Sequence, residues 1–428
     1  MNTTQLLKGN RATLKLLFIA ALSLAMLIPL FMVQSITHER QNLKRVAENT
    51  IANRWGGIGS LGGLVALVHK PSVKQDEWRG VALSDLNIEV QMMTEQRYLG
   101  IYEVPVYTTR VTIEGRLDWQ QLRHLQPQGD LLLWLPLGDV RGVREISSLN
   151  LDGFEIDARP LGIHTNLISG LQFKIPGQQR PGPSAEPEGL YRVELKLAGS
   201  GSILFLPLAD TTQVTLDADW PHPEFIGQYL PTERSISPGG VQASWQLLGL
   251  NRPYGDIWNV RDMPFDQLSH ASFGMRLETP VDSYQRSERS VKYGFLFITL
   301  TFFTLFLFEV MTGKPLHPVP YVLTGSALAV FYLVLLALSE YLPFSGAFAV
   351  AAALLVGIVT PYTGAVLGRR RRGYLVGAMM SLTYLLLYVL VTAQHAALLL
   401  GSLALLLAIA GLMYLTREVD WYGYGKSG

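Results

Sequence analysis

The sequence contains no cysteine among its 428 residues. This absence excludes disulfides, thiolate metal sites and a cysteine nucleophile, and it is compatible with an oxidising compartment. The motifs G-x-S-x-G, H-E-x-x-H and G-x-x-x-x-G-K-S/T are also missing. The formal net charge is only +1, and no basic and aromatic cluster indicates nucleic-acid binding. We therefore expect no enzyme activity, no catalytic, cofactor-binding or metal-binding residues, no cofactor and no nucleic-acid partner.

Charge is also scarce in the C-terminal third of the chain, where long apolar runs are interrupted by one basic cluster. Residues 369–372 are four adjacent arginines between uncharged stretches. Four arginines cannot lie in hydrocarbon, and lysine and arginine are disfavoured in short outside loops of membrane proteins. The cluster therefore predicts a cytoplasmic loop, and the rest of the chain can be oriented from it.

The apolar runs predict six membrane-spanning helices. Residues 373–416 would reach about 66 Å as one helix, against a hydrocarbon core of about 30 Å, so we expect them to fold back at Gln394-His395. The predicted spans are residues 16–33, 293–312, 320–338, 345–367, 374–393 and 396–415. In this arrangement the short loops that carry lysine or arginine lie inside and the short outside loops carry neither, so we expect both termini, including the tail at 417–428, in the cytoplasm.

The first apolar run, residues 16–33, follows Lys8, Arg11 and Lys15, and so has the general form of a signal peptide. Its 18 residues exceed the usual signal-peptide core of about 7 to 15. We therefore expect residues 1–36 to form a cytoplasmic N-terminus and an uncleaved anchor. A cleaved signal peptide is the alternative.

Residues 37–292 form a charged segment between the first and second spans, which we place in the periplasm. They hold 25 of the 35 Lys and Arg and 30 of the 34 Asp and Glu, a formal charge of 25 − 30 = −5. Apolar residues at helical spacing within 43–55 predict a stalk helix that ends at Gly56-Gly57 and packs on the domain beyond it. A partner-binding amphipathic helix is the alternative. Residues 293–416 would then form a five-span bundle.

From Ile88 onward the apolar period changes to two, which indicates half-buried strands. The alternation is clearest at residues 191–197, 214–220 and 241–247. No helical pattern separates successive strands, so we expect a large β-rich domain of antiparallel, sandwich-like sheets. Asp152-Gly153 and Gly199-Ser200-Gly201 predict hairpin turns. Proline and glycine throughout residues 176–189 predict a long exposed loop.

Three ionisable residues are candidates for a functional role. His222 lies between two prolines and could present its ring to a ligand or a metal, but without a companion histidine a rigid turn is favoured. Glu309 and Glu340 lie near span ends, where a carboxylate can reach the membrane interface. The alternative is a proton or ion path through the bundle, because ionisable groups within membranes are often functional.

Several separated stretches resemble the CreD family of inner-membrane proteins. They follow one another in order along nearly the whole chain, and they are 54–57 (RWGG), 102–107 (YEVPVY), 139–142 (DVRG), 219–223 (DWPHP), 225–227, 230–234, 287–297, 368–373, 397–402, 413–417 and 419–422. The resemblance implies a Gram-negative inner-membrane protein linked to cell-envelope integrity. It also implies an association with the CreB/CreC two-component system and effects on colicin tolerance, the β-lactam response and biofilm. It brings no established catalytic residues.

Together these observations favour a non-enzymatic envelope protein. Large β surfaces commonly bind other proteins or polymers. We therefore expect the periplasmic domain to bind an unidentified envelope protein or polymer, while the spans contact the lipid bilayer. A transporter, or an ion or proton pathway through the five-span bundle, is the alternative, although the spans offer mainly hydroxyl groups near their centres.

Overall fold

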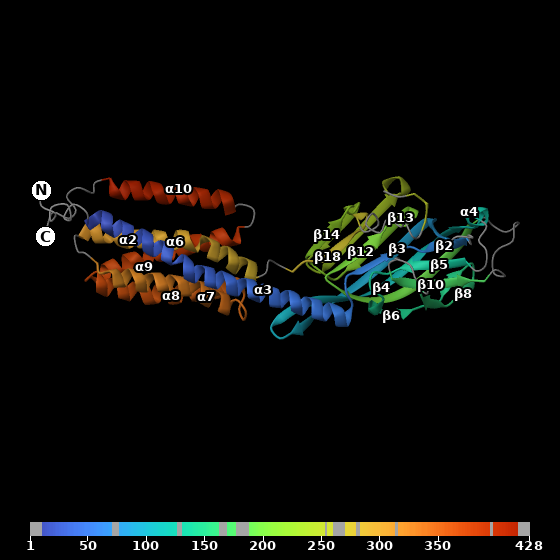
Figure 1. Cartoon of the computed structure of the whole chain (residues 1–428), viewed down its shortest axis with the longest axis horizontal. Coiled ribbons are helices and arrows are strands. Elements are labelled where there is room, and N and C mark those ends of the chain that lie inside the picture. The colour runs from blue at the N-terminus through green and yellow to red at the C-terminus, as the bar shows by residue number, and fades with distance from the viewer. Residues whose placement is uncertain are drawn as a thin grey trace. The chain divides into compact units, whose positions relative to one another are not determined.

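The computed structural model describes residues 11–70, 77–125, 131–161, 169–176, 188–252, 255–259, 270–279, 283–312, 316–393 and 397–417. The contacts within it divide the chain into a helical unit, residues 1–43 with 281–428, and a β-rich unit, residues 44–280. Figure 1 shows the helices of the first unit and the strands of the second. The expected domain borders at residues 36 and 292 fall inside two continuous helices, which pass the predicted membrane boundary without a break.

The helical unit consists of long apolar helices. They are α2 (Arg11–Ala25), α3 (Leu27–Trp55), α6 (Ser283–Thr312), α7 (Pro318–Leu338), α8 (Phe344–Val366), α9 (Arg370–Thr392) and α10 (Ala397–Thr416). In the described part of the chain, five stretches are long and apolar enough to cross a membrane, namely Leu14–Trp55, Ser283–Val310, Pro318–Leu338, Phe344–Val366 and Arg370–Thr392. They coincide with five of the six predicted spans as helices that could cross a membrane by length and composition. The sixth corresponds to α10, whose apolar stretch Leu399–Gly411 is shorter, so that span stays a prediction.

Helices α8 and α9 approach each other at small residues. A Cβ atom added to Gly373 would lie 2.6 Å from the Cα atom of Gly364 and 2.6 Å from the carbonyl oxygen of Thr360. Such close backbone contact is possible because neither glycine carries a side chain. Pro361 lies inside α8, and the helix continues through it to Val366.

The β-rich unit is built from strands that vary widely in length. They are β1 (Gly59–Gly62), β2 (Val65–Lys70), β3 (Glu77–Leu99), β4 (Tyr102–Asp118), β5 (Leu131–Pro136), β6 (Val143–Ile146), β7 (Leu149–Leu151), β8 (Phe154–Ile156), β9 (Ala158–Pro160), β10 (Gly170–Ile175), β11 (Glu188–Ser200), β12 (Ser202–Leu206), β13 (Ala209–Ala218), β14 (Pro223–Gly227), β15 (Glu233–Ser237), β16 (Gly240–Leu248), β17 (Ile257–Asn259) and β18 (Phe273–Leu277). A short helix, α4 (Trp119–His124), follows β4, and two 3-10 turns lie at Val140–Gly142 and Gly249–Asn251.

Strand β3 organises the larger of two sheets. The first part of β3 pairs antiparallel with β2 and β17, and the rest pairs antiparallel with β4 and parallel with β13. Its 23 residues therefore join strands that would otherwise form separate sheets, and the result is one 14-stranded sheet. The second sheet has the order β1-β12-β18-β14.

The expected sandwich of antiparallel sheets is not confirmed. The β-rich segment between the first and second spans is present, but β13 runs parallel to β3 and β1 runs parallel to β12. Alternation of apolar residues reports only which face of a strand is buried. It carries no information about the direction or identity of the neighbouring strand. The pattern therefore could not show that β3 pairs with β2 and β17 at one end and with β4 and β13 along the rest.

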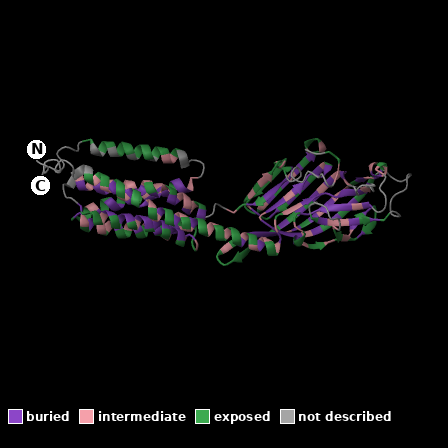
Figure 2. Cartoon of the chain, viewed as in Figure 1, coloured by how far each residue is buried: buried purple, intermediate pink, exposed green. Residues whose placement is uncertain are grey.

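The predicted half-buried strands are confirmed by alternating burial along β11, β13 and β16 (Figure 2). The inward residues form one large apolar cluster that includes Phe205, Trp245 and Phe273. Their rings pack with centroids 5.7 to 6.1 Å apart. Truncation of a buried aromatic of this size typically costs about 3 to 5 kcal/mol, so this cluster is a main source of stability.

The two predicted hairpin turns have different outcomes. Asp152 and Gly153 have positive φ and connect the antiparallel pair β7 and β8, which confirms the first. The second was wrong, because β11 pairs with β4 whereas β12 pairs with β1 and β18. Gly201, at φ 74°, instead turns the chain from the larger sheet into the smaller one.

Parts of three further predictions lie outside the described residues. They concern most of the loop at 176–189, the Gln394-His395 turn and the tail beyond residue 417. The arginine cluster is described: α9 begins at Arg370, and the side chain of Arg372 donates a hydrogen bond to the carbonyl oxygen of Leu367 at 3.0 Å. Arg369, Arg370 and Arg371 are exposed.

Candidate functional site

The last residues of α3 are held against the strands of the β-rich unit. The indole of Trp55 packs beside Val106 and donates a hydrogen bond to the carbonyl oxygen of Tyr107 at 3.2 Å. Two guanidinium groups face its ring, Arg97 at 4.3 Å and Arg144 at 5.1 Å from the centroid. Arg144 also donates to the carbonyl oxygen of Trp55 at 2.7 Å. The end of α3 therefore packs on strands of the β-rich unit, and its role as a stalk stays a prediction.

Asp139 fixes the backbone directly after this helix. Its carboxylate accepts a hydrogen bond from the amide of Gly57 at 2.9 Å and two from the guanidinium of Arg141 at 2.9 Å each. The hydrogen bond from Arg141, aided by that from Gly57, lowers the pKa of Asp139 to about 2. Asp139 is therefore ionised at any physiological pH, and its charge strengthens both contacts.

Tyr107 completes the junction beneath the helix end. Its buried hydroxyl donates to the carbonyl oxygen of Ser202 at 2.8 Å and accepts from the amide of Gly59 at 3.1 Å. Gly56 has φ 146°, and a Cβ atom there would lie 2.3 Å from the carbonyl oxygen of Ala198. Only glycine fits this position. The RWGG, YEVPVY and DVRG stretches, far apart in sequence, thus meet at one structural junction.

The outer face of the larger sheet is polar across six neighbouring strands. One register row crosses β11, β4, β3, β13, β16 and β15, and its residues are Lys196, Arg110, Gln91, Asp217, Gln242 and Ser235. All but Lys196, which is half-buried, are exposed. The row places a basic end and an acidic end on the same face, with an amide between them.

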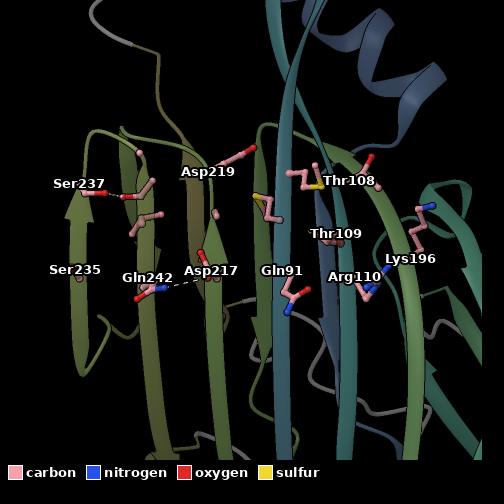
Figure 3. Close-up of a pocket in the computed structure, with 16 residues that line it drawn as sticks. Gln91, Thr108, Thr109, Arg110, Lys196, Asp217, Asp219, Ser235, Ser237 and Gln242 are labelled. Atoms are coloured by element: carbon pink, nitrogen blue, oxygen red, sulfur yellow. Dashed lines mark hydrogen bonds between the residues drawn. The ribbon is translucent and has the colours of Figure 1, made fainter.

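This row lines a groove of about 670 Å³, shown in Figure 3. Arg110 and Lys196 lie at one side of Gln91, and Asp217 and Asp219 lie at the other. Adjacent strands are about 4.8 Å apart, so the backbones of Arg110 and Asp217 are separated by about 10 Å. The side-chain hydroxyls of Ser235 and Ser237 and the amide of Gln242 line the acidic side.

Three charges in this groove lack an oppositely charged partner among the residues that the structure describes. Arg110 forms no ion pair there, Asp217 accepts a hydrogen bond from the amide of Gln242 at 3.2 Å, and Asp219 accepts from Thr94 at 2.7 and 2.8 Å. Lys196 pairs with Glu145 at 3.1 Å. The groove therefore offers one cation and two anions that remain available to a ligand.

A second cavity on the same sheet, of about 710 Å³, differs in this respect. Its guanidinium groups pair with the carboxylates around them. Arg192 lies 2.6 Å from Glu114, and Arg116 lies 3.0 Å from Asp85. Because these charges compensate one another, this cavity has less to offer a charged ligand.

In the helical unit, Glu309 is the centre of a buried ion pair. Its side chain is 1% exposed, and its carboxylate lies 2.5 Å from Lys15 Nζ and accepts a hydrogen bond from the Tyr321 hydroxyl at 2.9 Å. Lys15 also donates to the carbonyl oxygen of Leu316 at 2.6 Å. Glu309 does lie near the end of its span, but it is buried there and joins α6 to α2 and α7.

Glu340 has a comparable position just beyond the C-terminal end of α7. Its carboxylate lies 3.4 Å from Arg40 Nε and 3.5 Å from the Tyr284 hydroxyl. Ser339, the preceding residue, caps the helix. Glu340 therefore connects α3, α6 and the end of α7, whereas Glu309 connects α2, α6 and α7 near the other ends of α6 and α7.

His222 lies in a turn, with an exposed side chain. Its carbonyl oxygen accepts hydrogen bonds from the indole of Trp220 at 3.0 Å and from the amide of Glu278 at 3.2 Å. The described part of the chain contains no group of three or more His, Asp or Glu residues arranged to hold a metal ion. His222 thus belongs to the β-rich unit, whereas Glu309 and Glu340 lie near opposite ends of α7 in the helical unit.

Two comparisons with known proteins match almost the whole chain. The family model described as "Inner membrane protein CreD" matches residues 11–422. The curated Inner membrane protein CreD of Escherichia coli (strain K12) is 31% identical over 429 residues, which cover 94% of this chain and 92% of that protein.

Two solved structures match with low scores. An M1 zinc metallopeptidase from Deinococcus radiodurans aligns at 12% identity and a TM-score of 0.19, over 39% of each chain. A mutant of that peptidase bound to a Tyr-ser-ala substrate aligns at the same identity and TM-score, over 75% of this chain and 93% of that one. Scores this low carry no argument about fold or activity. The family match extends over nearly all of the sequence, and the chain therefore belongs to the CreD family of inner membrane proteins.

Proposed function

We propose that this protein is a non-enzymatic inner-membrane protein that supports cell-envelope integrity by binding an envelope component through its β-rich unit. The polar outer face across β11, β4, β3, β13, β16 and β15 carries the proposal, because its groove holds charges that nothing in the described chain neutralises. The envelope-stress and β-lactam response associated with the CreB/CreC system, and colicin tolerance, would be the consequences of this binding.

The proposed orientation places the β-rich unit in the periplasm and both termini in the cytoplasm. The exposed arginines at 369–371 support it, since such a cluster resists translocation. Alkaline phosphatase fused after Gly56 should be active, whereas fusions after Gly373 and Gly428 should be inactive. Phosphatase activity at Gly373 would reverse the whole orientation.

Binding by the sheet face can be tested in living cells by site-specific photocrosslinking. A photoreactive residue at Gln242 or Thr215, both exposed on this face, should capture an envelope component, with a change in yield under β-lactam treatment. The matched control is Glu155, an exposed position on β8. Equal yields at all three positions would contradict the proposal, as would a normal envelope in cells whose chain lacks residues 37–292.

Transport through the bundle remains the second candidate, because Glu309 is a buried carboxylate within a span. Its contacts with Lys15 and Tyr321 account for its burial without a transported ion. If the purified protein moved a solute or protons across liposomes, and Glu309→Gln abolished that movement, transport would replace the binding proposal.

A further inference from the structure

We propose that the groove at Arg110 and Asp217 binds a short zwitterionic peptide that lies across the strands. This inference rests on the proposed binding function and names the class of ligand. It starts from the separated charges of the groove: the guanidinium of Arg110 can receive a carboxylate, and the carboxylates of Asp217 and Asp219 can receive an ammonium group. Charge-assisted hydrogen bonds of this kind are about twice as strong as neutral ones.

The register sets the length of the ligand. Arg110, Gln91 and Asp217 occupy one row on three consecutive strands, so their backbones span about 10 Å. An extended peptide advances about 3.4 Å per residue, so three or four residues separate its terminal charges by the required distance. A single amino acid is too short to reach both charges.

The middle of the groove suits peptide groups. Gln91 lies between the two charged ends and carries one amide donor group and one acceptor. The amide of Gln242 and the hydroxyls of Ser235 and Ser237 line the acidic side. Because the peptide would cross the strands, it would contact these side chains rather than add a further strand at the edge of β15.

The neighbouring cavity provides the contrast that singles out this groove. Arg192 and Glu114 neutralise each other at 2.6 Å, and so do Arg116 and Asp85 at 3.0 Å. Arg110 and Asp217 are separated by Gln91 and do not pair, although their residue types would allow it. A ligand with a charge at each end would supply the missing counter-charges at both positions.

Binding of alanine peptides to the full chain in detergent tests this inference by calorimetry. Trialanine should bind saturably, and either N-acetylation or C-terminal amidation should weaken it about tenfold, which corresponds to about 1.4 kcal/mol. In Arg110→Gln, trialanine should bind about tenfold more weakly and amidation should have no further effect. Asp217→Asn keeps a side-chain oxygen that can accept from Gln242. In this variant trialanine should also bind about tenfold more weakly, and N-acetylation of the peptide should have no further effect.

Arg192→Gln is the matched control, since it removes an exposed guanidinium from the same face without touching the groove. It should bind trialanine within about twofold of the parent chain, and all variants should share the parent's thermal unfolding temperature, because exposed charges contribute little to stability. Equal binding of free and capped peptides, an equal loss in Arg192→Gln, or no saturable binding of trialanine would overturn the inference. Crosslinks from Gln242 in cells would then leave the broader binding function standing with a different ligand.

Discussion

Two ion pairs of this protein, one in each unit, lie in opposite environments. In the helical unit, the side chains of Lys15 and Glu309 are 17% and 1% exposed. In the β-rich unit, those of Arg192 and Glu114 are 56% and 41% exposed, although the two pairs have nearly equal separations of 2.5 and 2.6 Å. The comparison shows that the distance between two charged groups does not by itself set their contribution to stability. Exposure to solvent sets it, because water screens the exposed pair and would solvate either partner alone.

Breaking the buried pair should have the largest effect. Glu309→Ala leaves Lys15 without its carboxylate and removes the acceptor of the Tyr321 hydroxyl. Removing one partner of a buried pair costs about 3 to 5 kcal/mol. We expect a markedly lower unfolding temperature in detergent, measured by loss of the helical circular-dichroism signal, and less protein in the membrane fraction.

The double variant Lys15→Met with Glu309→Leu sharpens this test. Replacement of a buried ion pair by apolar residues is often neutral, so the double variant should recover most of the stability that Glu309→Ala loses. If Glu309→Ala were as stable as the parent chain, the pair would not be desolvated, and the contrast with the sheet face would fail.

The sequence located Glu309 near the end of a span, but it did not reveal Lys15 as its partner, which lies 294 residues away. Hydropathy indicated the five segments whose helices could cross a membrane, because the hydrocarbon core acts on each segment separately. Alternation likewise gave the half-buried strands. Partners are set by the three-dimensional arrangement, and this is why the parallel pairing of β13 with β3 and the turn at Gly201 were missed.

The candidate site was missed for the same reason. Arg110 and Asp217 are ordinary polar positions in two alternating strands, and only the register through β3 brings them into one row. The sequence indicated part of the junction around Trp55, because the RWGG and DVRG stretches resemble those of the CreD family. Their meeting at Asp139 and Gly57 depends on pairings that no local pattern encodes.

Substitution of Asp139 should have an effect on stability between those of the buried and the exposed ion pair. Its side chain is 13% exposed, and Asp139→Asn removes the charge that binds Arg141 and Gly57. Hydrogen bonds to charged groups contribute about 1.5 to 3 kcal/mol, so we expect a loss of about 2 kcal/mol near neutral pH. Thermal unfolding of the parent chain and the variant in the same detergent measures the difference.

The difference at Asp139 should depend on pH in a definite direction. Its pKa is about 2 in the folded chain against 3.8 ordinarily, so the unfolded chain binds the proton more tightly. The stabilisation is therefore fully present above about pH 5, and it is lost as the pH falls from about 4 through 2. A difference between parent and variant that stayed constant from about pH 6 to about pH 2.5 would show that the charge of Asp139 is not the source.

The smallest effect should come from the exposed pair. Glu114→Gln removes the partner of Arg192, but both side chains are largely solvated and Arg192 retains Glu194 at 2.8 Å. Exposed pairs typically contribute about 0.2 to 1 kcal/mol, so we expect a change in stability below about 0.5 kcal/mol, and a smaller one in high salt, where the charges are screened. Unfolding at low and high salt measures both. A loss as large as that of Asp139→Asn, unchanged by salt, would mean that this sheet face is covered in the folded protein, and exposure to solvent would then no longer distinguish the two ion pairs.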